Sequence, residues 1–202
     1  MPVPIIYITD ISSDGVTIIT EDLRKRGLDF LRLVNVDEPS IRVVRDVGSY
    51  AGRIPLSDMQ ADTNYSIAVA RSFLSDNVNM EELEQYFSDP IFIRTWPGVP
   101  SEPTNVTGYR LNATSVRVAW SKPMHPRGTI DDYSVLYIYK TPNDYVHDSV
   151  PQMNPDEYQA DIHDLPSGVS VDVTVKAHTR ASSEGKGGGW SLESTMYTIP
   201  GK

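Results

Sequence analysis

Hydrophobic and polar residues alternate along most of the chain, with the period of two that a half-buried β-strand requires. The clearest run is Ser115–Trp120, in which Val116, Val118 and Trp120 share one face. Three further runs in the second half show the same alternation: 133–137, 158–162 and 171–177. Stretches rich in proline and glycine separate these runs,. The spacing predicts an antiparallel β-sandwich of about seven strands.

The first half of the chain repeats this scheme in a more divergent form. The run Val16–Thr20 corresponds to 116–120, and Tyr65–Val69 corresponds to 171–175. Both pairs are offset by roughly 100 residues, the length of one sandwich. The sequence therefore predicts an all-β chain of two tandem sandwiches.

A proline-rich segment, 97–103, lies between the two repeats and predicts a short, stiff connection,. We place the domains at 1–97 and 98–202. Trp96 stands directly before the connection and is a candidate for a contact between the domains. Because the chain stops at a Pro-Gly pair that matches the start of the connection, we expect it to be a piece of a longer array.

Residues 79–88 depart from the alternating pattern. Met80, Leu83 and Phe87 recur with helical spacing, and glutamates fill the first turn,. We predict a short helical insertion there. Two interpretations remain open: the apolar side packs back over its own sandwich, or it contacts a neighbouring domain or a protein partner.

Three Asn-X-Ser/Thr sequons begin at Asn64, Asn105 and Asn112. About one such match is expected by chance among eight asparagines, so three favour an extracellular or cell-surface glycoprotein,. Asn112 is the best candidate for N-glycosylation because it falls at a predicted turn. Asn105 falls on or near a strand, and Asn64 adjoins a predicted core tyrosine.

The charge balance narrows the choice of partners. Lys and Arg number 18 against 27 Asp and Glu, a net charge of −9, which opposes both nucleic acid and anionic lipid,. No apolar run is long enough to span a membrane, so we expect membrane attachment only through an anchor outside this fragment,. With no Cys and four scattered His, the sequence suggests no metal site, no cofactor and no catalytic set,.

The second half resembles a fibronectin type III domain. The likeness rests on Trp120, on Tyr133-X-Val135-X-Tyr137, and on Leu165 three residues before a glycine. The resemblance implies that Trp120 fills the space between two sheets, together with Tyr133 and Val135.

The first half resembles the same family more weakly. Tyr65 matches the position of the family's tyrosine corner, a tyrosine whose hydroxyl bonds to the backbone a few residues upstream,. The second half has Val171 at that position and is expected to lack this bond.

The resemblance implies that the chain binds proteins and spaces neighbouring domains without catalysis, because type III domains share no common active site. We expect a fragment of an adhesion protein or receptor ectodomain, similar to receptor tyrosine phosphatases or neural adhesion molecules, with unknown protein partners. Two alternatives stay open. One is an intracellular structural array of the sarcomeric kind, and the other is an accessory module of a larger enzyme.

Overall fold

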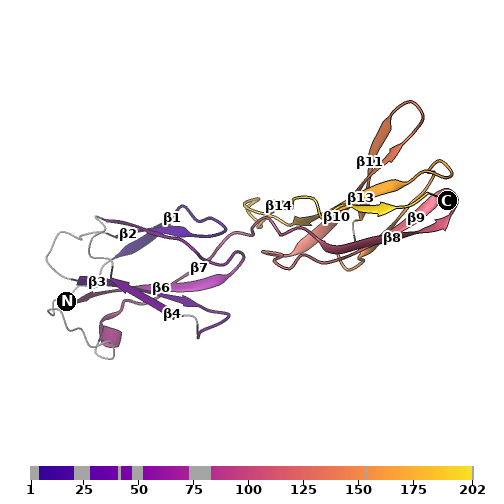
Figure 1. The fold of residues 1–202 in the computed structure, drawn as a ribbon. Helices are drawn as coiled ribbons and strands as arrows, with labels where there is room; N and C mark the ends of the chain where they lie inside the picture. The colour runs from indigo at the N-terminus through magenta and orange to yellow at the C-terminus, as the bar shows by residue number, and fades with distance from the viewer. Residues whose placement is uncertain are drawn as a thin grey trace. The chain divides into compact units, whose positions relative to one another are not determined.

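The structure is a computed structural model that describes residues 5–20, 28–40, 42–46, 52–72, 83–152 and 154–201. It divides into two compact units, Met1–Trp96 and Pro97–Lys202 (Figure 1). The described strands pair antiparallel in both units. The prediction of an all-β chain built from sandwiches is confirmed.

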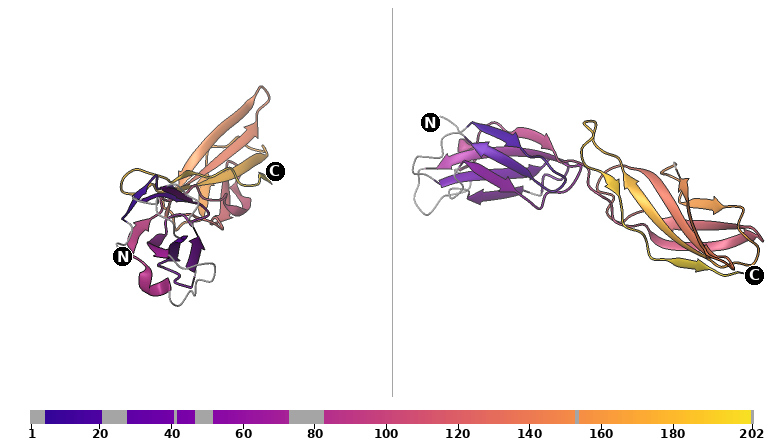
Figure 2. Two further views of the ribbon diagram at one scale, coloured as in Figure 1. Left: turned by 90° about the vertical axis from the view of Figure 1, so that its left-hand side faces the viewer. Right: turned by 90° about the horizontal axis from the view of Figure 1, so that it is seen from above.

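The first unit contains two sheets. One has the order β1-β2-β5, from Ile6–Thr9, Val16–Thr20 and Arg53–Leu56. The other has the order β4-β3-β6-β7, from Arg42–Asp46, Leu28–Asn35, Asn64–Ser72 and Ile91–Arg94. Alternate residues of the two sheets, such as Ile18 and Ile67, meet in one buried cluster,. Figures 1 and 2 show these strands.

The second unit has the same layout. Its smaller sheet has the order β12-β9-β8, from Gln159–Ile162, Ser115–Ser121 and Thr104–Asn112. The larger has the order β11-β10-β13-β14, from Tyr145–Gln152, Ile130–Lys140, Val171–Thr179 and Gly189–Trp190. A further short strand, β15 (Tyr197–Ile199), pairs with the other end of β13. The last strand of the sandwich is therefore split in two.

The residues assigned to the core from the sequence lie in buried clusters. Those of the second unit are Trp120, Tyr133, Val135, Tyr137 and Leu165. The rings of Trp120 and Tyr133 lie 5.4 Å apart between centroids, in the tilted arrangement that aromatic pairs favour,. Tyr65 belongs to the cluster of the first unit.

Of the helical insertion expected at 79–88, the described residues show Leu83 in α-helical conformation and one 3₁₀ turn, η1 (Glu84–Tyr86), so the helical part ends before Phe87. Residues 79–82 lie outside the described residues. Phe87 ends the turn because its backbone is extended and forms a bridge with Ala70 of β6. Met80 lies outside the described residues.

Candidate functional site

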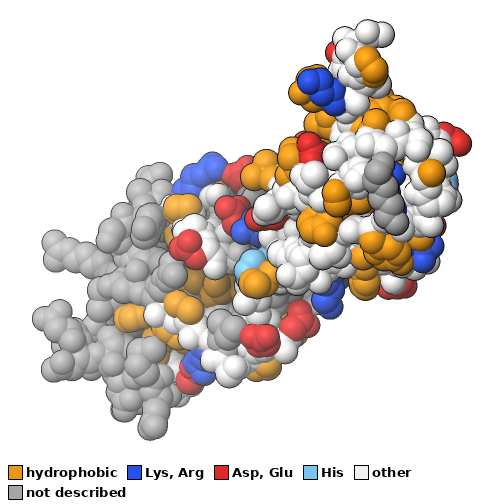
Figure 3. Space-filling model, turned by 45° about the vertical axis from the view of Figure 1, so that its right-hand side comes forward, with side chains coloured by type: hydrophobic (Ala, Val, Ile, Leu, Met, Phe, Trp, Pro, Cys, Tyr) orange, Lys and Arg blue, Asp and Glu red, His pale blue; other side chains and the backbone are white. Residues whose placement is uncertain are grey.

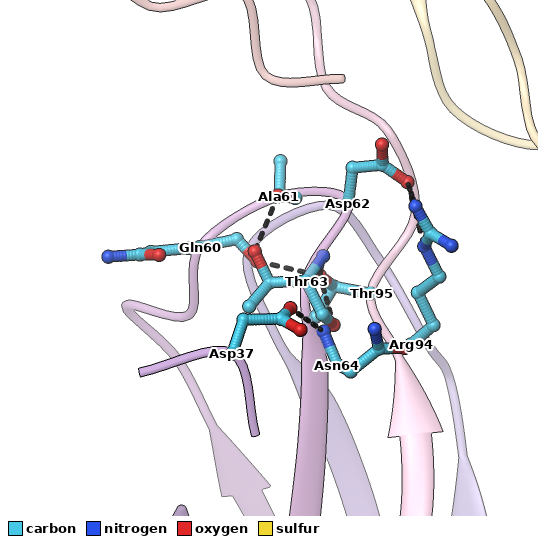
Figure 4. A network of polar contacts seen from close by, with 8 residues as sticks. All are labelled: Asp37, Gln60, Ala61, Asp62, Thr63, Asn64, Arg94 and Thr95. Carbon is cyan, nitrogen blue, oxygen red and sulfur yellow. Dashed lines mark hydrogen bonds and ion pairs between the residues drawn. The ribbon is translucent and has the colours of Figure 1, made fainter. Parts of the chain in front are cut away.

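A network of hydrogen bonds supports the end of the first unit beside the first sequon (Figure 4). The Thr95 hydroxyl donates to the Gln60 carbonyl at 2.6 Å and accepts the Thr63 N–H at 3.0 Å. The Thr63 hydroxyl in turn donates to the Ala61 carbonyl at 2.8 Å. These bonds fasten the turn before β6 to the chain that leaves β7.

Asn64 begins β6 next to this network. Its N–H donates to Asp37 at 3.4 Å, and its strand neighbour Arg94 forms an ion pair with Asp62 at 2.9 Å (Figure 4). The Asn64 side chain is partly buried, and its amide makes no hydrogen bond to another described residue. Among the described residues, the amide nitrogen therefore has no hydrogen-bond partner.

The other two sequons are more open. Asn105 is exposed in β8 with φ 53° at a register shift, and its amide donates to the Ser121 hydroxyl at 3.2 Å. Asn112 is exposed at the turn between β8 and β9, where its carbonyl oxygen accepts the Thr114 N–H at 2.8 Å. The turn thus holds Asn112 by its oxygen and leaves the amide nitrogen, the atom that carries a glycan, toward solvent. Occupancy of all three sequons stays a prediction.

The segment 83–88 crosses the outer side of β6. Tyr65, Ile67 and Val69 face the core, so Ala68 and Ala70 face outward, yet both are at most 1 % exposed,. Leu83 is 2 % exposed, and η1 contacts β6. Small outward residues thus leave room for the segment to pack on the sheet.

Charges also hold this segment. Glu84 pairs with Arg32 at 2.7 Å and with Arg42, and the Arg32 guanidinium lies 4.4 Å from the centre of the Phe87 ring,. Leu83 and Phe87 therefore contact their own sandwich. A contact of this segment with a partner stays a prediction.

Trp96 is partly buried, and its backbone is fixed. Its N–H donates to the Ser12 carbonyl at 2.9 Å, and its carbonyl accepts the Asp62 N–H at 3.1 Å. The main chain at Trp96 thus belongs to the first unit. The predicted role of its ring as a contact between domains stays a prediction.

The split between β14 and β15 is bridged by serine side chains. The Ser191 hydroxyl accepts the Ala177 N–H at 3.0 Å, and the Ser194 hydroxyl accepts the Val175 N–H at 2.9 Å. Both serines are buried, at 5 % and 6 % exposure. Their hydroxyls satisfy backbone groups of β13 that a continuous strand would otherwise pair with its own carbonyls.

Three large apolar side chains project from the same edge. Trp190, Leu192 and Met196 are 44 %, 80 % and 55 % exposed. The Trp190 ring lies 5.0 Å from that of His178, whose Nδ1 contacts Asp131 at 2.7 Å. Figure 3 shows hydrophobic side chains in several clusters on the visible face of the second unit. Such exposure favours contact with another protein.

Burial and ion pairing shift the pKa values of several ionisable groups in the second unit. Burial raises the pKa of Tyr133 to about 12, and Tyr158 and Asp156 add to the shift,. Hydrogen bonds from Arg117, at 2.6 and 2.7 Å, lower the pKa of the Asp161 carboxyl, and burial partly opposes this. Tyr133 belongs to the core, and Arg117 and Asp161 pair across two strands. Their shifted pKa values therefore result from packing and do not indicate catalysis.

Among the residues that the structure describes, no group of three or more His, Asp or Glu is close enough to hold a metal ion. Within the same ranges, no helix has the length and apolar character needed to cross a bilayer.

Comparison with known proteins identifies the family. The model of the fibronectin type III domain matches residues 101–196. Residues 101–196 therefore form a fibronectin type III domain, and this domain is a non-catalytic module. The first unit shares the strand order of the second, with β4-β3-β6-β7 matching β11-β10-β13-β14. We propose that the first unit is a divergent member of the same family.

The chain is similar to parts of receptors and adhesion proteins. It is 26 % identical to ephrin type-A receptor 7 of Gallus gallus over 63 % of this chain and 12 % of that protein. It is 27 % identical to the cell adhesion molecule DSCAM of Gallus gallus over 77 % of this chain and 7 % of that protein. It is 26 % identical to receptor-type tyrosine-protein phosphatase F of Danio rerio, over 84 % of this chain and 9 % of that protein. The match thus spans a small part of each relative.

Sequence reasoning missed two features of the second unit. One is the serine-bridged split, for which Ser191 and Ser194 in the last strand were the available signal. The other is Arg110 of β8, which donates to the carbonyls of Val169 and Pro200. Nothing in the local pattern distinguishes Arg110 from an ordinary surface arginine.

Proposed function

We propose that the chain is a non-catalytic fragment of a receptor or adhesion ectodomain that binds proteins and spaces neighbouring domains outside the cell. Its similarity to an ephrin receptor, an adhesion molecule and a receptor phosphatase supports this at the level of the class. The observation that carries the proposal is the open Asn112 sequon on a fibronectin type III domain. A glycan there projects from a turn and leaves both sheets uncovered.

The proposal is tested by secretion. The chain is expressed in a eukaryotic cell line behind an added signal peptide, and its intact mass is measured before and after treatment with peptide N-glycosidase. We expect a glycan that Asn112→Gln removes. The matched control is Asn143→Gln, an asparagine outside any sequon, which leaves the glycan mass unchanged.

The remaining sequons refine the result. We expect Asn105→Gln to lower the glycan mass as well, because this side chain is exposed, and Asn64→Gln to have the smallest effect, because its site is partly buried. A folded, secreted chain that carries no glycan at any site would contradict the proposal. The intracellular scaffold would then be the better explanation.

A further inference from the structure

The outer face of the larger sheet in the first unit is covered at one end of β6 and open at the other. Asn64, Ser66, Ala68 and Ala70 face outward, because the residues between them face the core,. Both alanines are at most 1 % exposed, and the segment 83–88 packs at this end of the strand. Asn64 and Ser66, at the other end, are only partly buried. The open part of the face therefore holds the first sequon.

Two apolar side chains flank this open part. Ser66 pairs with Val34 of β3 on one side and with Phe92 of β7 on the other. Ile91 and Ile93 pack against the core, so Phe92 points outward, and it is 68 % exposed,. Val34, also on the outer face, is partly buried. We call Val34, Ser66 and Phe92 the cradle, in which the small serine lies between two larger apolar residues.

Asn64 lies next to the cradle on the same face. It pairs with Arg94 of β7, so Phe92, two residues before Arg94, is its diagonal neighbour. Diagonal neighbours on adjacent strands are about 7–8 Å apart, within reach of large side chains. Arg94 forms an ion pair with Asp62 at 2.9 Å and gives the site a polar edge (Figure 4). A group bonded to Asn64 can therefore contact both an apolar surface and a charged one.

A sugar ring matches this mixture of surfaces. The first residue of an N-linked glycan is N-acetylglucosamine, which is bonded to the asparagine amide nitrogen and has an apolar face of C–H groups and a rim of polar groups. Its apolar face gains free energy by covering exposed aromatic and aliphatic side chains, while the rim stays hydrated. Among the described residues, neither the Asn64 side-chain amide nor the Ser66 hydroxyl forms a hydrogen bond that the sugar would break.

We propose that Asn64 carries an N-linked glycan whose first N-acetylglucosamine packs over Ser66, between Val34 and Phe92. The sugar covers the end of the outer face that the segment 83–88 leaves open. The contact stabilises the first unit in those chains that carry a glycan at Asn64, even where Asn64 is the least occupied of the three sequons. This inference rests on the proposed function, because N-linked glycans are added to exported chains.

The first test locates the sugar. The whole chain is secreted from cells that make high-mannose glycans, and an endoglycosidase trims each glycan to one N-acetylglucosamine. Peptide mapping by mass then gives the occupancy of Asn64. With ¹³C-labelled phenylalanine rings, we expect nuclear Overhauser contacts between the sugar and Phe92. Phe30 is the internal control, because it pairs with Ala70, which is about 20 Å along β6 from Asn64,.

The second test measures what the contact contributes. Thermal unfolding of the first unit is followed by the ¹³C-labelled methyl group of Met59, which lies in its core. Phe92→Ala is made in the glycosylated chain and in Asn64→Gln, which keeps an amide but carries no sugar. We expect Phe92→Ala to lower the unfolding temperature by at least about 3 °C more in the glycosylated chain. The control Tyr7→Ala, at an exposed tyrosine of the other sheet, lowers it equally in both.

Two results would overturn the contact. One is a glycan at Asn64 that shows no Overhauser contact to Phe92, and the other is an equal cost of Phe92→Ala with and without the sugar. A Phe92 signal that shifts with protein concentration in Asn64→Gln would instead place a second copy of the chain on the cradle, which overturns the proposed occupant.

The fate of the proposed function is read separately. A secreted chain with a glycan at Asn112 and none at Asn64 would overturn this inference and keep the proposed function. A secreted, folded chain with no glycan at any site would overturn both.

Discussion

The Tyr65 hydroxyl accepts the backbone N–H of Gln60 at 2.8 Å, and Tyr65 is 4 % exposed. This bond pins the turn before β6 to the core of the first unit. The second unit has Val171 at the matching position, and Arg110 reaches from β8 to the Val169 and Pro200 carbonyls instead. The two units thus fasten the same corner by different means.

Removing the Tyr65 hydroxyl tests this bond. We expect Tyr65→Phe to destabilise the first unit by about 1–3 kcal/mol, because the Gln60 N–H loses its acceptor in a partly buried site. Urea unfolding is followed by the NMR signal of the Met59 methyl group, which lies in the first core. Tyr7→Phe, at a tyrosine that is 49 % exposed, is the control and leaves the unfolding midpoint in place. No difference between the two variants would show that the bond does not stabilise the unit.

Substitutions of Trp120 test whether this residue lies in the core of the second unit. The side chain is 5 % exposed and packs on Tyr133, so Trp120→Ala is expected to cost about 3–5 kcal/mol in the free energy of unfolding,. The indole Nε1 has no hydrogen-bond partner among the described residues, so Trp120→Phe loses no bond and costs less. Trp190→Ala removes a tryptophan that is 44 % exposed and changes stability by about 0.5 kcal/mol or less,. Equal losses for Trp120→Ala and Trp190→Ala would contradict the assignment of Trp120 to the core.

Leu83 tests whether the segment 83–88 belongs to the sandwich. We expect Leu83→Ala to destabilise the first unit by about 2–4 kcal/mol, because the side chain is 2 % exposed,. Tyr86→Ala is the control on the same turn, since Tyr86 is 47 % exposed and its loss leaves the Met59 unfolding curve unchanged. A Leu83→Ala variant with normal stability would instead revive the interpretation that this segment serves a partner.

Ionisation of Tyr133 is expected to lower the stability of the second unit at high pH. Burial raises its pKa to about 12, whereas an unfolded tyrosine ionises near pH 10,. Between these values the unfolded chain has lost the proton and the folded chain retains it, so stability decreases as pH rises through this window. Urea midpoints of the second unit, measured from pH 9 to 12, are expected to decline less steeply in Tyr133→Phe. An equal decline in the variant would assign the effect to other groups, such as Tyr137, whose pKa burial also raises.

The fold follows from the sequence wherever one face of a strand meets a core. Val116, Val118 and Trp120 are buried and alternate with the partly buried Arg117 and Ala119, as expected for a strand with one face on the core,. The same alternation makes β13 recognisable. The extent of the helical insertion was harder to predict because Phe87 pairs with Ala70, a strand contact that helical periodicity does not reveal. The outward Ala68 and Ala70 were the available hint that something packs there.

The candidate binding features were less predictable because they arise from contacts between distant segments. The Trp190 ring of β14, for example, lies beside the His178 ring of β13, whose Nδ1 contacts Asp131 of β10. The sequons, in contrast, are readable directly, and only their exposure needed the structure,.

The serine bridges at the split strand also affect whether a neighbouring molecule can pair with this sheet. A regular outer strand offers a row of unpaired main-chain groups, onto which a neighbouring molecule can add a strand of its own. Here the edge of β13 is capped in part by the Ser191 and Ser194 hydroxyls, and the run of main-chain groups is interrupted. Where the last strand is split, the Val175 and Ala177 N–H groups are therefore unavailable to a strand of a neighbouring molecule,.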